Sequence, residues 1–147
     1  MSEKLLEIKD LSVVYHTEDG EVYAVNHADL SINKGETLGL VGETGAGKTT
    51  TCLSIMRLLP EKLGEIISGD ILLNGESIMS KSEAEMRSIR GNEVSMIFQD
   101  PMTSLNPVYT VGDQIAEVIQ IHNPNYTKEQ VEKGVDEMFL MVGLPAE

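Results

Sequence analysis

The sequence predicts an α/β fold in which an antiparallel sheet comes first, a strand–loop–helix unit follows, and helices form the last third. The central observation is an apolar run at 37–41, a glycine-rich loop at 42–50 and a helical stretch at 50–59, which follow one another without interruption. Upstream, short apolar runs between residues 6 and 32 are separated by turn residues, as in antiparallel strands. Downstream, apolar residues recur at helical spacing over 111–142.

Three short strands are expected before the glycine-rich loop. The first is an edge strand with one irregularity near Asp10, and its apolar residues are Leu6, Ile8, Leu11, Val13 and Tyr15. Asp19-Gly20 supplies a turn into the second strand, 21–25. The third strand covers 28–32, and the turn Asn33–Glu36 leads from it into the run before the loop.

The glycine-rich loop fits the pattern G-x-x-x-x-G-K-[ST], which is typical of phosphate binding. Its glycines allow positive φ and a close approach to a ligand, so that successive N–H groups converge on an anion. Lys48 adds a mobile positive charge, and the hydroxyl of Thr49 is a hard oxygen ligand for Mg²⁺. The helix that follows directs its positive dipole end at the phosphates and ends at Pro60. We therefore predict a nucleotide phosphate site formed by Gly42, Glu43, Thr44, Gly45, Ala46, Gly47, Lys48, Thr49 and Thr50.

The middle of the chain predicts two more strands and a short helix. Residues 66–73 alternate loosely and end at Asn74-Gly75, a tight-turn signal. Ser82–Glu85 matches a capping box that opens a helix ending near Gly91. The apolar run 94–98 indicates a buried strand that stops before Pro101.

The last third predicts two helices. Val111, Ile115, Val118 and Ile119 fall on one face of the first. Thr127–Gln130 is a second capping box, and the apolar residues after it repeat at helical spacing until Gly143. Methionines and aromatics at this spacing indicate a packing surface rather than a cofactor site.

The composition of the chain excludes several classes of function. The chain has 147 residues, about one domain, with 24 acidic and 11 basic residues and a net charge of −13. A nucleic-acid groove needs a basic face, so nucleic-acid binding is not expected, and most carboxylates form a solvated surface. Cys52 is the only cysteine, which excludes an intrachain disulfide, and we expect it to be buried in the helix after the loop. The sequence has neither a signal peptide nor a spanning helix, so we expect a cytoplasmic or peripheral protein.

The order of these features resembles the ATP-binding subunits of ABC transporters over essentially the whole chain. The likeness is carried by the loop, by Tyr15 upstream of it, and by Gln99 about fifty residues after it. The string 97–107, Ile-Phe-Gln-Asp-Pro-Met-Thr-Ser-Leu-Asn-Pro, is similar to the dipeptide/oligopeptide (and nickel) importer branch. That branch also typically carries the sequence found at 35–39, Gly-Glu-Thr-Leu-Gly.

The resemblance implies an ABC-type P-loop NTPase fold and an ATPase that binds ATP and Mg²⁺. It implies that Tyr15 stacks on adenine, worth roughly 1–3 kcal/mol, although an ordinary strand tyrosine is the alternative. It gives catalytic roles to Lys48 and Gln99, with Thr49 and Gln99 as ligands of Mg²⁺ or its water. The histidine after Tyr15, His16, is read as a solvent-facing residue. The implied partners are transmembrane permease subunits, a second ATP-binding subunit in a homo- or heterodimer and, indirectly, an extracytoplasmic solute-binding protein, with the chain peripheral on the cytoplasmic face of the membrane.

One part of the family pattern is missing. No Leu-Ser-Gly-Gly-Gln type sequence, no strand ending in Asp-Glu and no switch histidine follow Gln99. The chain is therefore similar to the amino-terminal half of such a subunit, with a β subdomain and P-loop core at 1–99 and the Q-loop and start of a helical subdomain at 100–147. We expect ATP–Mg binding with negligible hydrolysis, exposed apolar surface where the Asp-Glu strand would lie, and marginal stability or self-association.

The sequence leaves two alternative hypotheses of function to compare. A non-catalytic nucleotide-binding module or pseudo-subunit would bind ATP in a complex without turnover. An unrelated kinase or GTPase is rejected, because the only guanine-like motif, Asn33–Glu36, precedes the loop and ends in Glu. The transported solute stays open between peptide, nickel and others.

Overall fold

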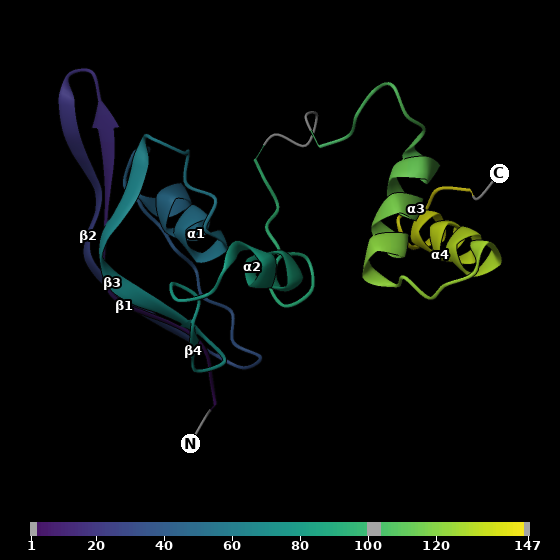
Figure 1. Ribbon diagram of the computed structural model, residues 1–147, viewed down its shortest axis with the longest axis horizontal. Coiled ribbons are helices and arrows are strands. Elements are labelled where there is room, and N and C mark those ends of the chain that lie inside the picture. Colours follow the sequence, from purple (N-terminus) through teal and green to yellow (C-terminus); the bar gives the residue numbers. More distant parts are fainter. Residues whose placement is uncertain (1–2, 100–103, 146–147) are drawn as a thin grey trace. The chain divides into compact units, whose positions relative to one another are not determined.

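A computed structural model describes residues 3–99 and 104–145 of the chain. It forms two compact units, Met1–Met96 and Ile97–Glu147. The first unit carries the sheet and two helices, and the second carries two helices (Figure 1). In chain order the elements are β1 (Lys4–Thr17), β2 (Gly20–Asn33), α1 (Lys48–Met56), β3 (Gly64–Leu73), β4 (Glu76–Ser77), α2 (Glu83–Ile89), α3 (Val111–His122) and α4 (Lys128–Met141).

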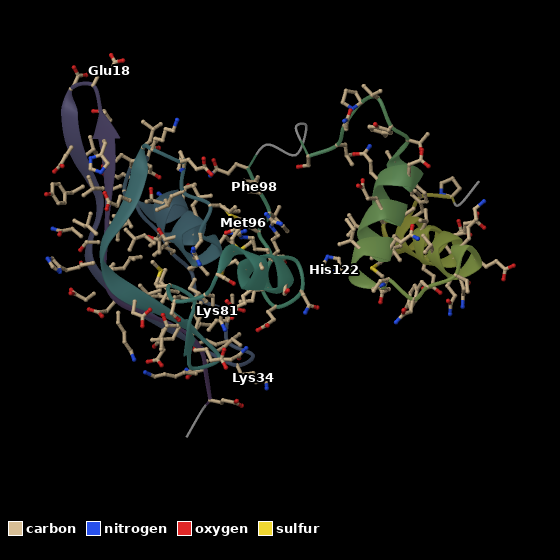
Figure 2. All side chains as sticks on the ribbon, in the orientation of Figure 1. Glu18, Lys34, Lys81, Met96, Phe98 and His122 are labelled. Carbon is tan, nitrogen blue, oxygen red and sulfur yellow. The ribbon has the colours of Figure 1, made fainter. Side chains whose placement is uncertain are left out.

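The sheet of the first unit is antiparallel, with strand order β2-β1-β3-β4. The strand predicted at the edge, β1, is in fact interior, because β2 and β3 pair with its two sides. The two strands predicted at 21–25 and 28–32 are one continuous strand, β2. The predicted turn at Asp19-Gly20 is present, and Glu18 lies at the tip of the resulting hairpin (Figure 2).

The irregularity expected near Asp10 is confirmed as a bulge. The β1–β2 register shifts between Ile8 and Leu11, and Asp10 has φ 51°. A bulge adds one residue to a strand, which restores the inward direction of Leu11 after Ile8, and both side chains are buried. His27 on β2 also has positive φ, 47°, and its Nδ1 lies 2.6 Å from Asp10 Oδ1.

The core of the first unit lies between the sheet and the helices. Its buried members are apolar residues of three strands, of α2 and of the turn after β4: Leu6, Ile8, Leu11, Val13, Val25, Ile71, Leu73, Ile78, Met86 and Ile89. The predicted turn at Asn74-Gly75 is confirmed, with φ values of 51° and 83°. The predicted capping box at the start of α2 is also confirmed.

Two predicted strands do not form. Residues 37–41 are not a strand, and Val41 is 91% exposed. Residues 94–98 make a single bridge, from Val94 to Arg90, and Ile97 is 96% exposed. In the described parts of the chain no other strand pairs with either run, so their backbone groups have no ladder to join.

The second unit consists of α3 and α4. The predicted capping box at Thr127 and Gln130 is present at the start of α4, and Thr110 caps α3. An open groove of about 550 Å³ lies along the unit. Its lining includes Leu105, Val111, Val118, Met138, Phe139 and Val142.

Candidate functional site

The glycine-rich loop joins the run 37–41 to α1 and takes the conformation that its glycines allow. Gly45 and Gly47 have φ values of 85° and 81°, in the region that favours glycine. The Ala46 N–H donates to the Glu43 carbonyl at 3.1 Å, which closes a tight turn within the loop. Gly47 caps α1 without any side-chain hydrogen bond. The first N–H groups of the helix thus have neither an intrahelical acceptor nor a side-chain cap, which suits an anion.

The backbone of strand β2 packs directly against the loop at Gly47. A Cβ added at Gly47 would lie 2.2 Å from the Ala24 carbonyl oxygen and 3.4 Å from Val25 Cγ2. Any side chain at this position would therefore displace the loop from β2. This contact explains why the residue before Lys48 has to be glycine, and no sequence pattern indicated Ala24 as its support.

Lys48, the first residue of α1, folds back onto the loop. Its Nζ donates to the carbonyl oxygens of Gly42 and Glu43, both at 2.6 Å. The ammonium group therefore lies within the curve of the loop, where a positive charge can meet a phosphate. The loop residues 42–46 around it are exposed.

The three threonines that follow differ in what their hydroxyls contact. Thr49 is exposed and its hydroxyl has no partner in residues 3–99 or 104–145, so it is free to bind a ligand. Thr50 is buried and its Oγ1 lies 3.4 Å from the Tyr15 hydroxyl. The Thr51 hydroxyl donates to the Gly47 carbonyl at 2.9 Å, which holds the first turn of α1. The helix begins at Lys48 and ends at Met56, earlier at both ends than the predicted 50–59.

Tyr15 is brought next to the loop by the β1 strand. It pairs with Gly64 at the end of the β1–β3 ladder and is half-buried. Its hydroxyl reaches the first turn of α1 through Thr50. His16, the next residue, is exposed as expected and its Nε2 lies 3.0 Å from Glu65 Oε2.

Gln99 is exposed and belongs to the second unit. Its predicted role as a ligand of Mg²⁺ stays a prediction, as do the roles of the loop residues and Tyr15. The next residues of the string that carried the family likeness, 100–103, lie outside the described residues. In the described parts of the chain, no group of three or more His, Cys, Asp or Glu side chains could hold a metal ion.

The far end of α1 is held by two arginines that the sequence did not indicate. Arg90 donates from Nε to the Met56 carbonyl at 2.8 Å and from Nη2 to the Arg57 carbonyl at 3.1 Å. Arg57 donates to the carbonyls of Ile78 and Lys81. The hydrogen bond from Arg90 lowers the pKa of the Glu83 carboxyl. Cys52, by contrast, is exposed on α1, so its predicted burial was wrong: the residue lies on the outer face of the helix.

Comparison with known proteins decides the family. The model of the ABC transporter family matches residues 25–145. The chain belongs to the ABC transporter family. The predicted resemblance to this family is therefore confirmed.

Two such relatives are named for peptide transport. The oligopeptide transport ATP-binding protein OppD of Bacillus subtilis is 46% identical over 142 residues, which are 97% of this chain and 39% of that protein. The dipeptide transport ATP-binding protein DppD of Lactococcus lactis subsp. cremoris is 44% identical over 143 residues, 97% of this chain and 41% of that protein. The chain thus spans about two fifths of the length of these relatives.

The solved structures confirm the fold. A dimeric ATP-binding cassette, described as a post-hydrolysis state bound to ADP and Pi, matches with a TM-score of 0.76 at 20% identity. The match covers 93% of this chain and 56% of the cassette. The predicted α/β fold of ABC type is confirmed. None of the helices in the described ranges has the length and apolar character that crossing a membrane requires.

Proposed function

We propose that this chain is the nucleotide-binding part of an ATP-binding subunit that drives an ABC importer of di- or oligopeptides. The observation that carries the proposal is the loop at 42–50, seated on β2 with Lys48 inside its curve. The names of the relatives OppD and DppD support the peptide class of solute. The net charge of −13 disfavours nucleic acid as a partner.

The residues present fit ATP. The uncapped start of α1 and the loop amides of 42–50 would hold the phosphates, with Lys48 as the counter-charge. The half-buried ring of Tyr15 would hold the base. The free hydroxyl of Thr49 would hold Mg²⁺, which supplies charge neutralisation at the phosphates. The role of Gln99 as a ligand of Mg²⁺ or its water is what the family resemblance implies.

We extend the proposal to the domain organisation and the assembly that the family resemblance implies. We assign 1–99 to the β subdomain and P-loop core, and 100–147 to the Q-loop and the start of a helical subdomain. The working complex would contain permease subunits, a second ATP-binding subunit and an extracytoplasmic solute-binding protein. The chain would then act at the cytoplasmic face of the membrane, with Lys48 and Gln99 serving hydrolysis.

A second candidate is a nucleotide-binding module without turnover. In either case the isolated chain should bind Mg-ATP and release negligible phosphate. The two are distinguished by phosphate release after a full-length ATP-binding subunit is added. Turnover above that of the added subunit supports the transport ATPase, and no gain supports the module.

The binding proposal is tested by calorimetry with Mg-ATP on the chain and on Lys48→Ala. We expect Lys48→Ala to weaken binding at least tenfold, about 1.4 kcal/mol, because the counter-charge of the phosphates is lost. Lys34→Ala is the control, since Lys34 is an exposed turn lysine in the same unit. A thermal melt of each variant checks the fold. No heat from the unaltered chain at millimolar Mg-ATP, or equal affinity of Lys48→Ala, would overturn the proposal.

A further inference from the structure

The aromatic ring of Tyr15 occupies space that a side chain at Gly64 would fill. A Cβ added at Gly64 would lie 2.9 Å from Tyr15 Cε1 and 3.1 Å from Leu59 Cβ. Real Cβ atoms essentially never approach another heavy atom closer than 3.0 Å, so one of the two groups would have to move. The backbone of Gly64 is outside the positive-φ region, in contrast to Gly45 and Gly47. Glycine is therefore required at position 64 because there is no space for a side chain, and not because the backbone needs a positive φ.

The backbone around Gly64 leaves the strand little freedom to give way. The Gly64 N–H donates to the Pro60 carbonyl at 2.9 Å, and the His16 N–H donates to the Leu63 carbonyl at 2.7 Å. Gly64 also pairs with Tyr15 in the β1–β3 register. Because the main chain is fixed on both strands, a methyl group at position 64 would be accommodated by displacement of the tyrosine ring.

The other end of the ring is fixed to the phosphate-loop helix. The Tyr15 hydroxyl lies 3.4 Å from Thr50 Oγ1, and Thr50 is 8% exposed in the first turn of α1. The Thr50 carbonyl accepts a hydrogen bond from the Ser54 hydroxyl at 2.8 Å, which continues the buried polar contacts along α1. The ring thus extends from the start of β3 to the helix that carries the loop. A displacement at Gly64 would shift the ring relative to the phosphate loop.

We propose that Gly64 is a positioning residue for the base site: its missing side chain sets where the Tyr15 ring lies, and so how strongly the base of a nucleotide is held. This inference rests on the proposed ATP binding. It predicts that a methyl group at position 64 weakens base-dependent affinity and leaves phosphate affinity unchanged. Gly64 is fourteen residues from the end of the loop, and no motif points to it.

The test compares Mg-ATP with Mg-tripolyphosphate, which has the phosphates but no base. In Gly64→Ala we expect the affinity for Mg-ATP to fall by about 5- to 150-fold, the range for loss of stacking on an aromatic ring. The affinity for Mg-tripolyphosphate should stay within twofold. Gly112→Ala is the matched control, because a Cβ there would meet its nearest neighbour at 3.8 Å, an ordinary contact. Equal loss for both ligands, or no loss for either, would overturn the inference.

A double variant separates positioning from general damage. In a Tyr15→Ala background, Gly64→Ala should cause no further loss of Mg-ATP affinity, because the ring that it displaces is gone. If Gly64→Ala alone is too unstable to purify, the double variant should recover soluble protein for the same reason. An additive loss in affinity, or no recovery, counts against the inference.

Nuclear magnetic resonance of the ligand-free chain tests the ring itself. Tyr15→Phe identifies the tyrosine signals, and cross-relaxation from the ring to the Gly64 Hα protons should be visible. In Gly64→Ala the ring resonances should shift. If the unaltered chain binds neither ligand, the proposed function fails, while an unmoved ring in Gly64→Ala is what overturns the role of Gly64.

Discussion

The two units of this chain use similar apolar patterns to different effect. In the sheet unit, apolar residues of β1, β3 and α2 form a shared core, in which Leu11, Ile71 and Met86 are completely buried. In the helical unit, of the described hydrophobic residues only Val131 is buried, and α3 and α4 leave an open apolar groove. Helical periodicity thus predicts which face of a helix is apolar, whereas burial of that face requires a second element packed against it.

The largest effect is expected when one apolar side chain in each unit is replaced by alanine. Ile71→Ala in β3 should lower the free energy of unfolding by about 2–5 kcal/mol, because it leaves a cavity in a closed core. Leu140→Ala in α4 should cost less than about 0.5 kcal/mol, because Leu140 is 64% exposed. Urea denaturation followed by circular dichroism measures both. Equal losses would show that Leu140 is covered in solution.

A second test concerns the polar contacts of the sheet unit. Arg90→Ala should lower the free energy of unfolding by about 1–3 kcal/mol, because the carbonyls of Met56 and Arg57 lose their donors at the end of α1. Arg87→Ala is the control, because Arg87 lies in α2 close to Arg90 and is exposed, so the change should be nearly neutral. Thermal melts compare the two variants. A neutral Arg90→Ala would mean that water replaces the guanidinium without cost.

A third test concerns the helix caps, which stabilise the helical unit although few of its side chains are buried. Thr127→Ala should cost about 1 kcal/mol in helix stability, because the Thr127 hydroxyl accepts from the Gln130 N–H at the start of α4. Thr127→Ser should restore it. Amide hydrogen exchange in the first turn of α4 is the measurement. Unchanged protection in Thr127→Ala would contradict a role for this cap.

The smallest effect is a pH dependence in α2. Hydrogen bonds from the Ser82 hydroxyl and backbone N–H lower the pKa of the Glu85 carboxyl below 4.5 in the folded chain. Because the folded pKa is the lower one, the contribution is present above pH 4.5 and is lost as the pH falls through the folded value. Glu85→Gln should flatten this acid dependence, measured by amide exchange in α2 between pH 6 and 3. A similar loss of protection in both proteins would contradict it.

Local chemistry was the predictable part of the fold. The capping boxes at Ser82 and Thr127 and the turn at Asn74-Gly75 were found correctly, because donor, acceptor and backbone preference lie within four consecutive residues. The bulge at Asp10 was visible as a break in the apolar alternation. The family and its fold followed from local motifs, the loop at 42–50 and the string at 97–107, and from their order along the chain.

Long-range contacts could not be read from the sequence. The runs 37–41 and 94–98 have strand-like composition, yet a strand forms only where another strand pairs with it. The Ala24 carbonyl below Gly47 and the contact of Gly64 with Tyr15 join residues more than twenty positions apart. Within the candidate site, the sequence indicated the loop, and the structure added what supports it.

The contacts of the Lys48 ammonium make anion capture an exchange reaction. In the free loop the two carbonyl oxygens of Gly42 and Glu43 act as internal substitutes for a ligand. An incoming phosphate must compete with them, so the measured affinity is the intrinsic one reduced by the fraction of loops with the lysine released. The same two contacts hold the shape of the ligand-free loop.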